Sequence, residues 1–374
     1  MVKLGDICTI NMGQSPSSSS YNSTGEGLPF FQGNADFGDI HPTVRIWCSN
    51  PIKIAEKGDL LISVRAPIGA LNIANEQCCI GRGLAALTNC TKNIYKEYLW
   101  FALLSKIDEL NSKGTGSTFK SINKKILAET SIPLPSLERQ KQIAKQLICL
   151  ATLLSRKKQQ LSKLDQLVKS RFIEMFGDPL TNTKNWSIMT LSKVCHIYGG
   201  GTPSKRHPEY FTGTMPWVSP KDMKTDIITD SIDHITNEAI TNSTTNIIPM
   251  RSILMVIRSG ILKHRLPVAI NNIPVTINQD MKAFVPNNMI IKPEFLMYYF
   301  KSIEFDILSG VRGVTADNID FKTFQKRNII VPLIQLQEQF ATFVQQVDKA
   351  KSSVKQSLEK LETLKKSLMQ EYFG

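Results

Sequence analysis

Apolar residues recur every seven positions in two long stretches of the chain that contain no glycine or proline. The first series is Leu147, Leu154, Leu161, Val168 and Met175, and the second is Phe340, Val347, Val354, Leu361 and Leu368. A seven-residue repeat over about 40 residues is typical of a coiled-coil seam. Each helix could instead cap only its own domain, but a helix of roughly 60 Å at 1.5 Å per residue exceeds what a small domain requires. The pattern therefore predicts two long helices that pack against each other.

The sequence before each long helix has short β-branched runs bounded by Gly, Pro and Asn, which is typical of strands and turns in a compact α/β domain. The clearest strands are expected at 60–64 and 253–257, followed by Arg65 and Arg258 respectively. Apolar residues at helical spacing predict further helices at 95–110 and 293–308. Prolines before each long helix mark the boundary between the two kinds of sequence.

The whole pattern occurs twice, because residues 4–177 and 191–374 align almost end to end. The offset is 187 residues from Leu4 to Leu191, 199 from Pro133 to Pro332, and 197 from Gly177 to Gly374. A repeat this long exceeds the roughly 20 to 50 residues of solenoid repeats and indicates a duplicated domain pair. The expected fold class is α/β (α+β): two domains in tandem at 1–135 and 178–332, separated by helices at 136–177 and 333–374. These helices should form an antiparallel coiled coil with pseudo-two-fold symmetry.

The charge balance favours a polyanionic partner. The 374 residues carry a formal net charge of +13 and a pI near 9.3, and a positive potential of this kind concentrates nucleic acid around a protein. A membrane is the poorer choice because no apolar run approaches the roughly 18 residues that span a bilayer. Charges at Lys3 and Asp6 interrupt the place where a signal peptide needs its apolar stretch. We therefore expect a cytoplasmic protein.

The sequence lacks the common signatures of catalysis. It has neither a phosphate-binding Gly-x-x-x-x-Gly-Lys-Ser/Thr loop nor a His-Glu-x-x-His zinc motif, and it lacks the Asn/Asp-Pro-Pro-aromatic motif of amino-methyltransferases. The five histidines form no evident ligand or acid–base set, and seven cysteines without a Cys-x-x-Cys pair are expected to be buried free thiols. We predict no catalytic residues, no metal site and no enzymatic activity in this chain.

Several stretches, in order and in both copies, resemble the specificity (S) subunits of type I restriction-modification enzymes. These stretches are 58–65 with 80–83 in the first copy, 277–283 in the second, and 132–143 at the start of the first long helix. The last stretch is the most specific because it recurs where the second long helix begins. The second copy departs from it at 331–335, which lacks the second proline and the following Glu-Arg-Gln-Lys run.

The resemblance implies a sequence-specific DNA-binding subunit of a larger complex that is a site-specific DNA adenine methyltransferase and endonuclease. Residues 1–135 and 178–332 would be target recognition domains, each reading half of a bipartite, asymmetric sequence in double-stranded DNA. The helices at 136–177 and 333–374 would set the spacing and dock two methyltransferase (M) subunits, and restriction (R) subunits would complete the nuclease. S-adenosylmethionine, ATP and magnesium would belong to those partners, with no cofactor in this chain.

Positive and amide side chains in turns are the physical candidates for contacts to DNA. Arginine and lysine bind phosphates or guanine edges, whereas glutamine pairs with adenine. The candidates in the first copy are Arg65, Arg82, Lys113, Ser117, Thr118 and Lys120, and those in the second are Lys205, Arg206, Arg258, Lys263, Arg265, Gln279 and Arg312.

Two other classes of function stay open at this point. A protein-interaction scaffold that does not bind DNA would show no salt-dependent DNA affinity even with its partners present. A self-contained methyltransferase or nuclease would act without partners, and the missing catalytic signatures argue against it.

Overall fold

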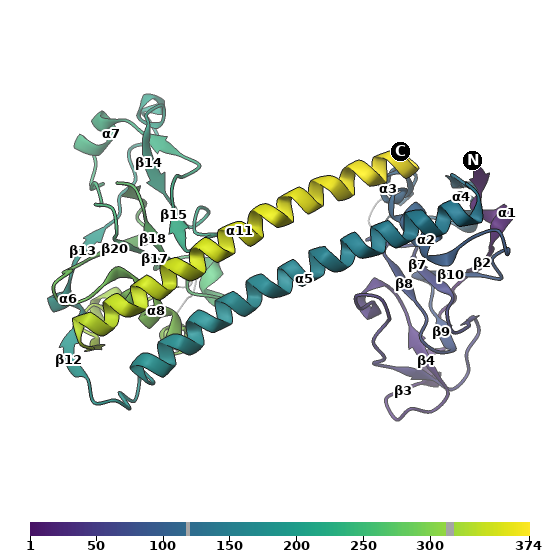
Figure 1. Ribbon diagram of the computed structural model, residues 1–374, viewed down its shortest axis with the longest axis horizontal. Coiled ribbons are helices and arrows are strands. Elements are labelled where there is room, and N and C mark those ends of the chain that lie inside the picture. Colours follow the sequence, from purple (N-terminus) through teal and green to yellow (C-terminus); the bar gives the residue numbers. More distant parts are fainter. Residues whose placement is uncertain (117–119, 312–317) are drawn as a thin grey trace. The chain divides into compact units, whose positions relative to one another are not determined.

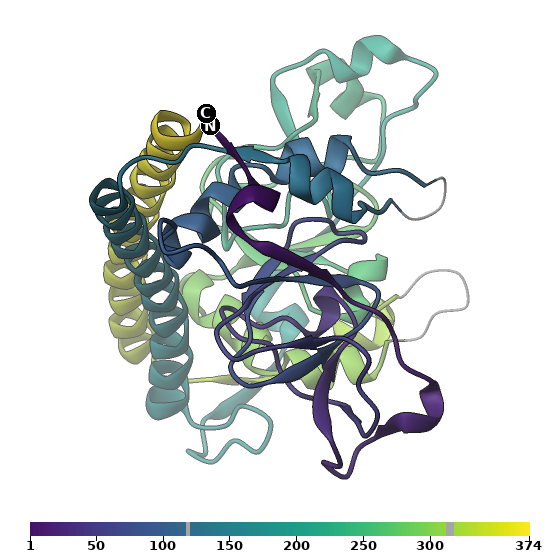
Figure 2. The ribbon, with the colours of Figure 1, turned by 90° about the vertical axis from the view of Figure 1, so that its right-hand side faces the viewer.

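The computed structural model describes residues 1–116, 120–311 and 318–374, which form two compact units. Unit 1 comprises Met1–Lys158 and Gln356–Gly374, and unit 2 comprises Gln159–Lys355. Both chain ends therefore belong to unit 1 (Figure 2). Each unit combines one α/β domain with parts of the two long helices, α5 (Leu137–Phe176) and α11 (Ile334–Phe373), whose courses are shown in Figure 1.

The described residues of the unit 1 domain form three sheets. Strands β2, β10, β7 and β8 form one sheet in that order, β3, β5, β4, β9 and β6 form a second, and β1 pairs with β11. Strands β4 and β9 pair in parallel, and the other strand pairs in the described part of this domain are antiparallel. The bounds are β1 Val2–Lys3, β2 Thr9–Met12, β3 Tyr21–Asn22, β4 Leu28–Phe31, β5 Trp47–Cys48, β6 Ile54–Ala55, β7 Leu60–Ser63, β8 Leu71–Ile73, β9 Cys78–Ile80, β10 Leu84–Thr88 and β11 Ser131–Ile132.

Short helices complete the domain of unit 1. They are α1 Leu4–Ile7, α2 Lys96–Leu104, α3 Ile107–Ser112 and α4 Lys124–Glu129, with 3-10 turns at Ser18–Ser20 and Asn34–Asp36. The main core lies between the first sheet and these helices and includes Tyr98 and Leu103 of α2. Helix α4 begins where the Asn123 side chain accepts a hydrogen bond from the Ile126 N–H at 3.0 Å, which satisfies one orphan donor of the first turn.

The domain of unit 2 repeats this arrangement with changes at the sheet edges. Strands β13, β20, β17, β18 and β15 form one sheet in that order, β16, β14 and β19 form a second, and β12 pairs with β21. The bounds are β12 Ser187–Thr190, β13 Cys195–Gly199, β14 Met215–Val218, β15 Ile227–Ile228, β16 His234–Ile235, β17 Ile253–Val256, β18 Val268–Asn271, β19 Thr276–Ile277, β20 Met281–Pro286 and β21 Asn328–Val331.

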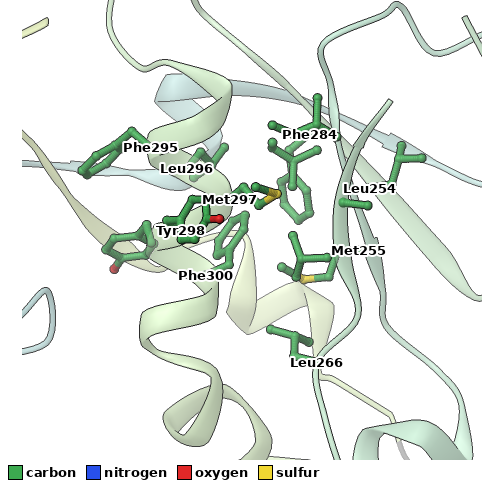
Figure 3. Close-up of a cluster of buried hydrophobic side chains, with 14 of the residues drawn as sticks. Leu254, Met255, Leu266, Phe284, Phe295, Leu296, Met297, Tyr298 and Phe300 are labelled. Carbon is green, nitrogen blue, oxygen red and sulfur yellow. The ribbon is translucent and has the colours of Figure 1, made fainter. Parts of the chain in front are cut away.

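Helix α8 covers one face of the five-stranded sheet in unit 2. Figure 3 shows Met297 and Phe300 of this helix close to Met255 and Phe284 of the strands, and all four belong to one buried cluster. The Phe284 and Phe300 ring centroids are 5.3 Å apart. The helices of this domain are α6 Leu191–Val194, α7 Asn237–Thr241, α8 Pro293–Ser302, α9 Glu304–Ser309 and α10 Phe321–Phe324, with 3-10 turns at Pro208–Phe211 and Gly260–Lys263.

The long helices pack antiparallel within each unit. In unit 1 the end of α11 lies against the first turns of α5, because the Tyr372 hydroxyl donates to Gln146 Oε1 at 2.8 Å. In unit 2 the end of α5 lies against the first turns of α11, where the Phe172 and Phe340 ring centroids are 5.5 Å apart. The Lys351 ammonium also pairs with Asp165 across the two helices at 2.6 Å. The predicted fold class, tandem mixed domains with two long antiparallel helices, is confirmed.

Helix bounds correct one part of the repeat alignment. Helix α5 begins at Leu137 and α11 at Ile334, and they end at Phe176 and Phe373, so the offset is 197 at both ends. Pro332 is therefore the counterpart of Pro135, and the alignment of Pro133 with Pro332 was wrong by two residues. The second copy has the second proline after all; it is Pro133 that has no proline counterpart.

Two local expectations were also wrong. The helices predicted at 95–110 and 293–308 are each split into two, at residues where the Ser105 and Ser302 hydroxyls donate to carbonyls three residues earlier. The first helix of each pair ends at or just before this serine, at Leu104 in α2 and at Ser302 in α8. Cys8 and Cys90 form a disulfide, so the expectation of free thiols fails for these two and holds for Cys48, Cys78, Cys79, Cys149 and Cys195, of which Cys149 is exposed.

Candidate nucleic-acid interface

Arg65 and Arg82 of unit 1 lie side by side at one end of the sheets. Arg65 follows β7, and Arg82 lies in the turn between β9 and β10. The two segments are joined because the Val64 N–H donates to the Gly83 carbonyl at 2.9 Å. Both arginines are exposed, and within the described residues neither side chain has a hydrogen bond or an ion pair.

The segment that follows α3 brings Lys120 to the same place. The Ala66 N–H donates to the Lys120 carbonyl at 3.1 Å, and Arg65 forms a β-bridge with Ser121. Lys113 lies at the end of α3, where its ammonium donates to Glu109 at 2.6 Å and this hydrogen bond lowers the pKa of Glu109. Ser117 and Thr118 were also predicted here, and they lie outside the described residues.

Unit 2 places Arg258 and Gln279 in the equivalent positions. Arg258 follows β17, and Gln279 lies in the turn between β19 and β20. The Ile257 N–H donates to the Asp280 carbonyl at 2.9 Å, which repeats the bond between Val64 and Gly83. Arg258 also forms a β-bridge with Asn318, as Arg65 does with Ser121. The difference is an ion pair, because Asp280 Oδ1 lies 2.6 Å from Nε of Arg258.

The remaining candidates of unit 2 lie on two exposed loops. Lys263 and Arg265 belong to the connection between β17 and β18, and Arg265 donates to the Met223 carbonyl at 3.1 Å. Lys205 and Arg206 follow β13 on a loop that begins where the Gly201 N–H donates to the Ile277 carbonyl at 2.9 Å. Within the described residues, no hydrogen bond or ion pair joins the side chains of Lys205, Arg206 or Arg265 to Gln279. Arg312, the last candidate, lies outside the described residues.

The connection between β17 and β18 is longer than its counterpart in unit 1. It spans residues 257–267 in unit 2, whereas β7 and β8 are joined by residues 64–70. The added length forms the 3-10 turn Gly260–Lys263, in which the Ser259 hydroxyl caps the Ile261 N–H. The insertion therefore presents Lys263 and Arg265 on a part of the site that unit 1 does not have.

The chemistry of this site is that of binding. Arginine side chains stay protonated at physiological pH, so they can hold phosphates and base edges but cannot act as general bases. No group of three or more His, Cys, Asp or Glu side chains suited to a metal ion occurs in residues 1–116, 120–311 and 318–374. Exposed guanidinium, ammonium and amide groups on adjoining turns are the donor set that DNA recognition uses.

Sequence reasoning missed the residues that position these side chains. Asp280 holds Arg258, the Ser15 hydroxyl accepts the Arg82 N–H at 3.3 Å, and Tyr21 lies close enough to Arg82 to sense its charge. Burial raises the pKa of Tyr21, and the Arg82 charge opposes that rise. The alignment of the two copies offered one signal for such a residue, because it places the acidic residue Asp280 where the first copy has Gly83.

A buried glutamine joins each domain to the long helix that follows it. Gln140 Oε1 accepts the Tyr95 N–H at 2.9 Å, and Nε2 donates to the Asn93 and Pro135 carbonyls at 2.9 Å each. Gln337 repeats the set with the Lys292 N–H at 2.8 Å and the Ile290 and Pro332 carbonyls at 3.1 and 2.8 Å. Both side chains are 0% exposed. We call these contacts the glutamine junctions; they tie the helix start to the domain that carries the exposed turns.

Comparison with known proteins identifies a family for this chain. A family model described as the type I restriction modification DNA specificity domain matches residues 1–165 and 183–363. The two matched stretches correspond to the two copies and together cover most of the chain.

Individual relatives agree with the family match. The EcoR124I/EcoR124II type I restriction enzyme specificity subunit of Escherichia coli is 36% identical over 189 residues, which are 49% of this chain and 46% of that protein. A Methanocaldococcus jannaschii protein, provisionally named as the MjaX type I restriction enzyme specificity subunit, is 42% identical over 171 residues, 45% of this chain and 40% of its own length. The match thus spans less than half the length of these two relatives.

A solved structure extends the likeness of the fold to the whole chain. The crystal structure of a type I restriction-modification S subunit from M. genitalium has a TM-score of 0.62 and 15% identity, and the likeness covers 100% of this chain and 95% of that one. In the described part of the chain, no helix has the length and apolar character needed to cross a membrane.

Proposed function

The chain belongs to the family of type I restriction modification DNA specificity proteins, and on that premise we propose that it is the DNA-recognition subunit of a type I restriction-modification complex. The observation that carries the proposal is the repeated site. Two domains of the same plan expose different side chains at the same turn, Arg82 in one and Gln279 in the other. Two equivalent but non-identical sites are what the recognition of two different half-sequences requires.

The proposal assigns a role to each part of the chain. Residues 1–135 and 178–332 are target recognition domains that bind the two halves of a bipartite, asymmetric target in double-stranded DNA. Residues 136–177 and 333–374 are spacer helices that fix the separation of the halves and dock two methyltransferase subunits, with restriction subunits joining them. The glutamine junctions support this assignment because they tie each helix start to the domain before it.

The reaction itself belongs to the partner subunits in this proposal. The chain is non-catalytic, holds no cofactor, and leaves S-adenosylmethionine, ATP and magnesium to the methyltransferase and restriction subunits. Its own side chains bind phosphates and base edges, and thereby determine which adenine the methyltransferase reaches. The charge of +13 supports association with DNA, and in this proposal the protein acts in the cytoplasm.

Mapping of methylated adenines tests the proposal directly. DNA is sequenced from cells that express this chain with its neighbouring methyltransferase and from cells that lack the chain. We expect a two-part motif that disappears with the chain, and we expect exchange of residues 1–135 for those of a relative to change one half only. An active methyltransferase without any such motif would favour a scaffold that does not bind DNA.

A binding experiment tests the site in unit 1. Replacing Arg65, Arg82 and Lys120 together by alanine should weaken DNA binding by the complex and flatten its salt dependence. The logarithmic slope should fall by up to about 0.9 for each phosphate that these side chains no longer neutralise. The matched control replaces Lys57, Lys92 and Lys96, exposed lysines near the opposite ends of the strands, by alanine. Equal effects in both variants would mean that charge alone matters and that the turns form no site.

A further inference from the structure

The turn that carries Arg82 and the turn that carries Gln279 are the same structural position in the two units. In unit 1 the strand before the turn pairs in parallel with β4, with Ile80 opposite Phe31, and in unit 2 it pairs with β14, with Ile277 opposite Val218. The strand after the turn is β10 or β20, the second strand of the main sheet in both units. The arginine and the glutamine are therefore alternative occupants of one site.

The backbone of each turn is held on both sides of the variable residue. In unit 1 the Gly81 N–H donates to the Phe31 carbonyl at 2.8 Å, and the Gly83 N–H donates to the Gln32 carbonyl at 3.1 Å. A side chain on Gly83 would meet the Gln32 oxygen at 2.4 Å, so the turn is packed tightly against its neighbour. The carbonyl of Gly83 accepts the Val64 N–H as well. A turn fixed in this way holds the Cα–Cβ direction of Arg82.

The turn of unit 2 is held by an equivalent set of bonds. The Asn278 N–H donates to the Val218 carbonyl at 2.9 Å, and the Asp280 N–H donates to the Asn278 side chain at 3.1 Å. The carbonyl of Asp280 accepts the Ile257 N–H at 2.9 Å. Gln279 itself is exposed, and in the described parts of the chain its amide has no hydrogen-bond partner. Each turn thus presents one exposed polar side chain from a rigid backbone.

The two side chains match two different bases. The guanidinium of arginine donates two parallel hydrogen bonds to O6 and N7 of guanine, whereas a glutamine amide both donates to and accepts from adenine at N7 and N6. Resting on the proposed DNA-recognition function, we propose that Arg82 and Gln279 are equivalent base-reading residues, with guanine as the base read by unit 1 and adenine as the base read by unit 2 at the corresponding place.

The neighbours of each turn supply contacts of another kind. Arg65 and Arg258 adjoin the turns in the two units, and an arginine side chain suits a phosphate that is present whatever the sequence. The proposed base-reading residue is a cation in the first copy and a neutral amide in the second, so a positive charge at this position is not needed for DNA binding by both units. The exposed residue at the centre of the turn differs between the copies, whereas the adjoining arginine is the same, so we assign base recognition to the first and DNA positioning to the second.

Exchange of the two residues tests the assignment. The variants Arg82→Gln and Gln279→Arg are assembled with the methyltransferase subunits and given a DNA library randomised in both half-sites, and methylated molecules are sequenced. We expect Arg82→Gln to change one position of the first half-site from guanine to adenine, and Gln279→Arg to change one position of the second from adenine to guanine. Each preference should shift by about 10-fold or more, as one bidentate contact allows.

The design separates the possible failures. The unaltered half-site in each variant reports that the complex is folded and active. An unchanged motif with active methylation in both exchange variants would overturn the base-reading assignment and leave the proposed function intact. Absence of a two-part motif with the parent chain would instead overturn the proposed function.

A loss of all methylation in the exchange variants leads to a second pair. Arg82→Ala and Gln279→Ala remove the base contact without introducing a competing one, so one position of one half-site should become tolerant of all four bases. Unchanged selectivity at every position in the alanine variants would overturn the assignment as well.

Discussion

The two units are alike at the glutamine junction and unlike at the exposed turn. Gln140 and Gln337 each make the same three hydrogen bonds to backbone groups and are fully buried. Arg82 and Gln279 share a backbone position but differ in charge and in hydrogen-bonding pattern. The difference follows from burial, because replacing a buried polar group leaves its partners unsatisfied, whereas an exposed side chain exchanges its contacts with water.

The largest expected effect is at the junctions. Gln140→Leu and Gln337→Leu each leave one N–H and two carbonyls without partners inside the protein. At about 1 kcal/mol or more for each unsatisfied group, either change should cost about 3–5 kcal/mol in its own unit. Hydrogen exchange measured on peptides from each unit gives the destabilisation separately for unit 1 and unit 2. Unequal values would show that the two junctions are similar in geometry but not in energy.

A matched control exists within unit 2. Asn271 is also fully buried and makes three backbone bonds, accepting from the Ser252 N–H at 2.9 Å and donating to the Pro249 and Ile273 carbonyls at 2.9 and 2.7 Å. Asn271→Leu should destabilise unit 2 to a similar degree, but exchange should increase first around β18. Gln337→Leu should increase it first at the starts of α8 and α11. The same pattern of exchange in both variants would contradict a specific role for the junction.

A smaller effect is expected at a position where both units have a positive backbone φ but carry different residues. Gly58 and Arg251 occupy equivalent places before β7 and β17 with positive φ values of 86° and 68°. Glycine adopts this conformation freely, whereas another residue does so at a cost of roughly 1–2 kcal/mol. Arg251 nevertheless pairs with Glu294, whose side chain is only 5% exposed. The ion pair to a buried carboxylate offsets the backbone strain.

Arg251→Gly tests this balance. Relief of about 1 kcal/mol of strain is outweighed by about 3 kcal/mol or more for a buried carboxylate left without its cation, so unit 2 should lose about 2 kcal/mol of stability. Adding Glu294→Gln should recover much of that stability, since the remaining group is neutral. The free energy of unfolding of both variants is measured in urea, with a spectroscopic probe in unit 2. If Arg251→Gly stabilised unit 2, the ion pair would contribute little.

The fold class was predictable from the sequence because each pattern that indicates it is local. Heptads that include Leu147 and Val168 predicted the long helices, and β-branched runs predicted β7 and β17. The alignment failed where it depended on burial, because Gln335, Gln337 and Gln339 alternate along the start of α11. Only Gln337 faces the domain and is fully buried, and no local pattern distinguishes it from the other two.

The candidate site was predictable to the same extent. Exposed arginines after strands and a glutamine in a turn are visible in the sequence, and the structure brings Arg65, Arg82 and Lys120 together in unit 1. The ion pair between Arg258 and Asp280 was not predictable, because it joins residues 22 apart whose approach depends on the register of β17 and β20. Which of the candidates contact DNA stays a prediction.

The smallest expected effect concerns that ion pair, which distinguishes Arg258 from Arg65. Asp280 occupies the place of Gly83 and partly neutralises Arg258, and both side chains keep contact with solvent at 24% and 49% exposure. Under the proposed function, Asp280→Asn should strengthen DNA binding by about 2- to 5-fold at low salt, since one repulsive charge is removed and one guanidinium is released. Glu238→Gln removes the same charge from an exposed helix of unit 2 and serves as the control. Fluorescence anisotropy with the assembled complex should show the gain in affinity shrinking as the salt concentration rises.

A double variant tests whether the ion pair restrains Arg258. Arg258→Ala should cost more DNA affinity in the Asp280→Asn background than in the parent chain. Equal costs would mean that Asp280 does not restrain Arg258 in binding.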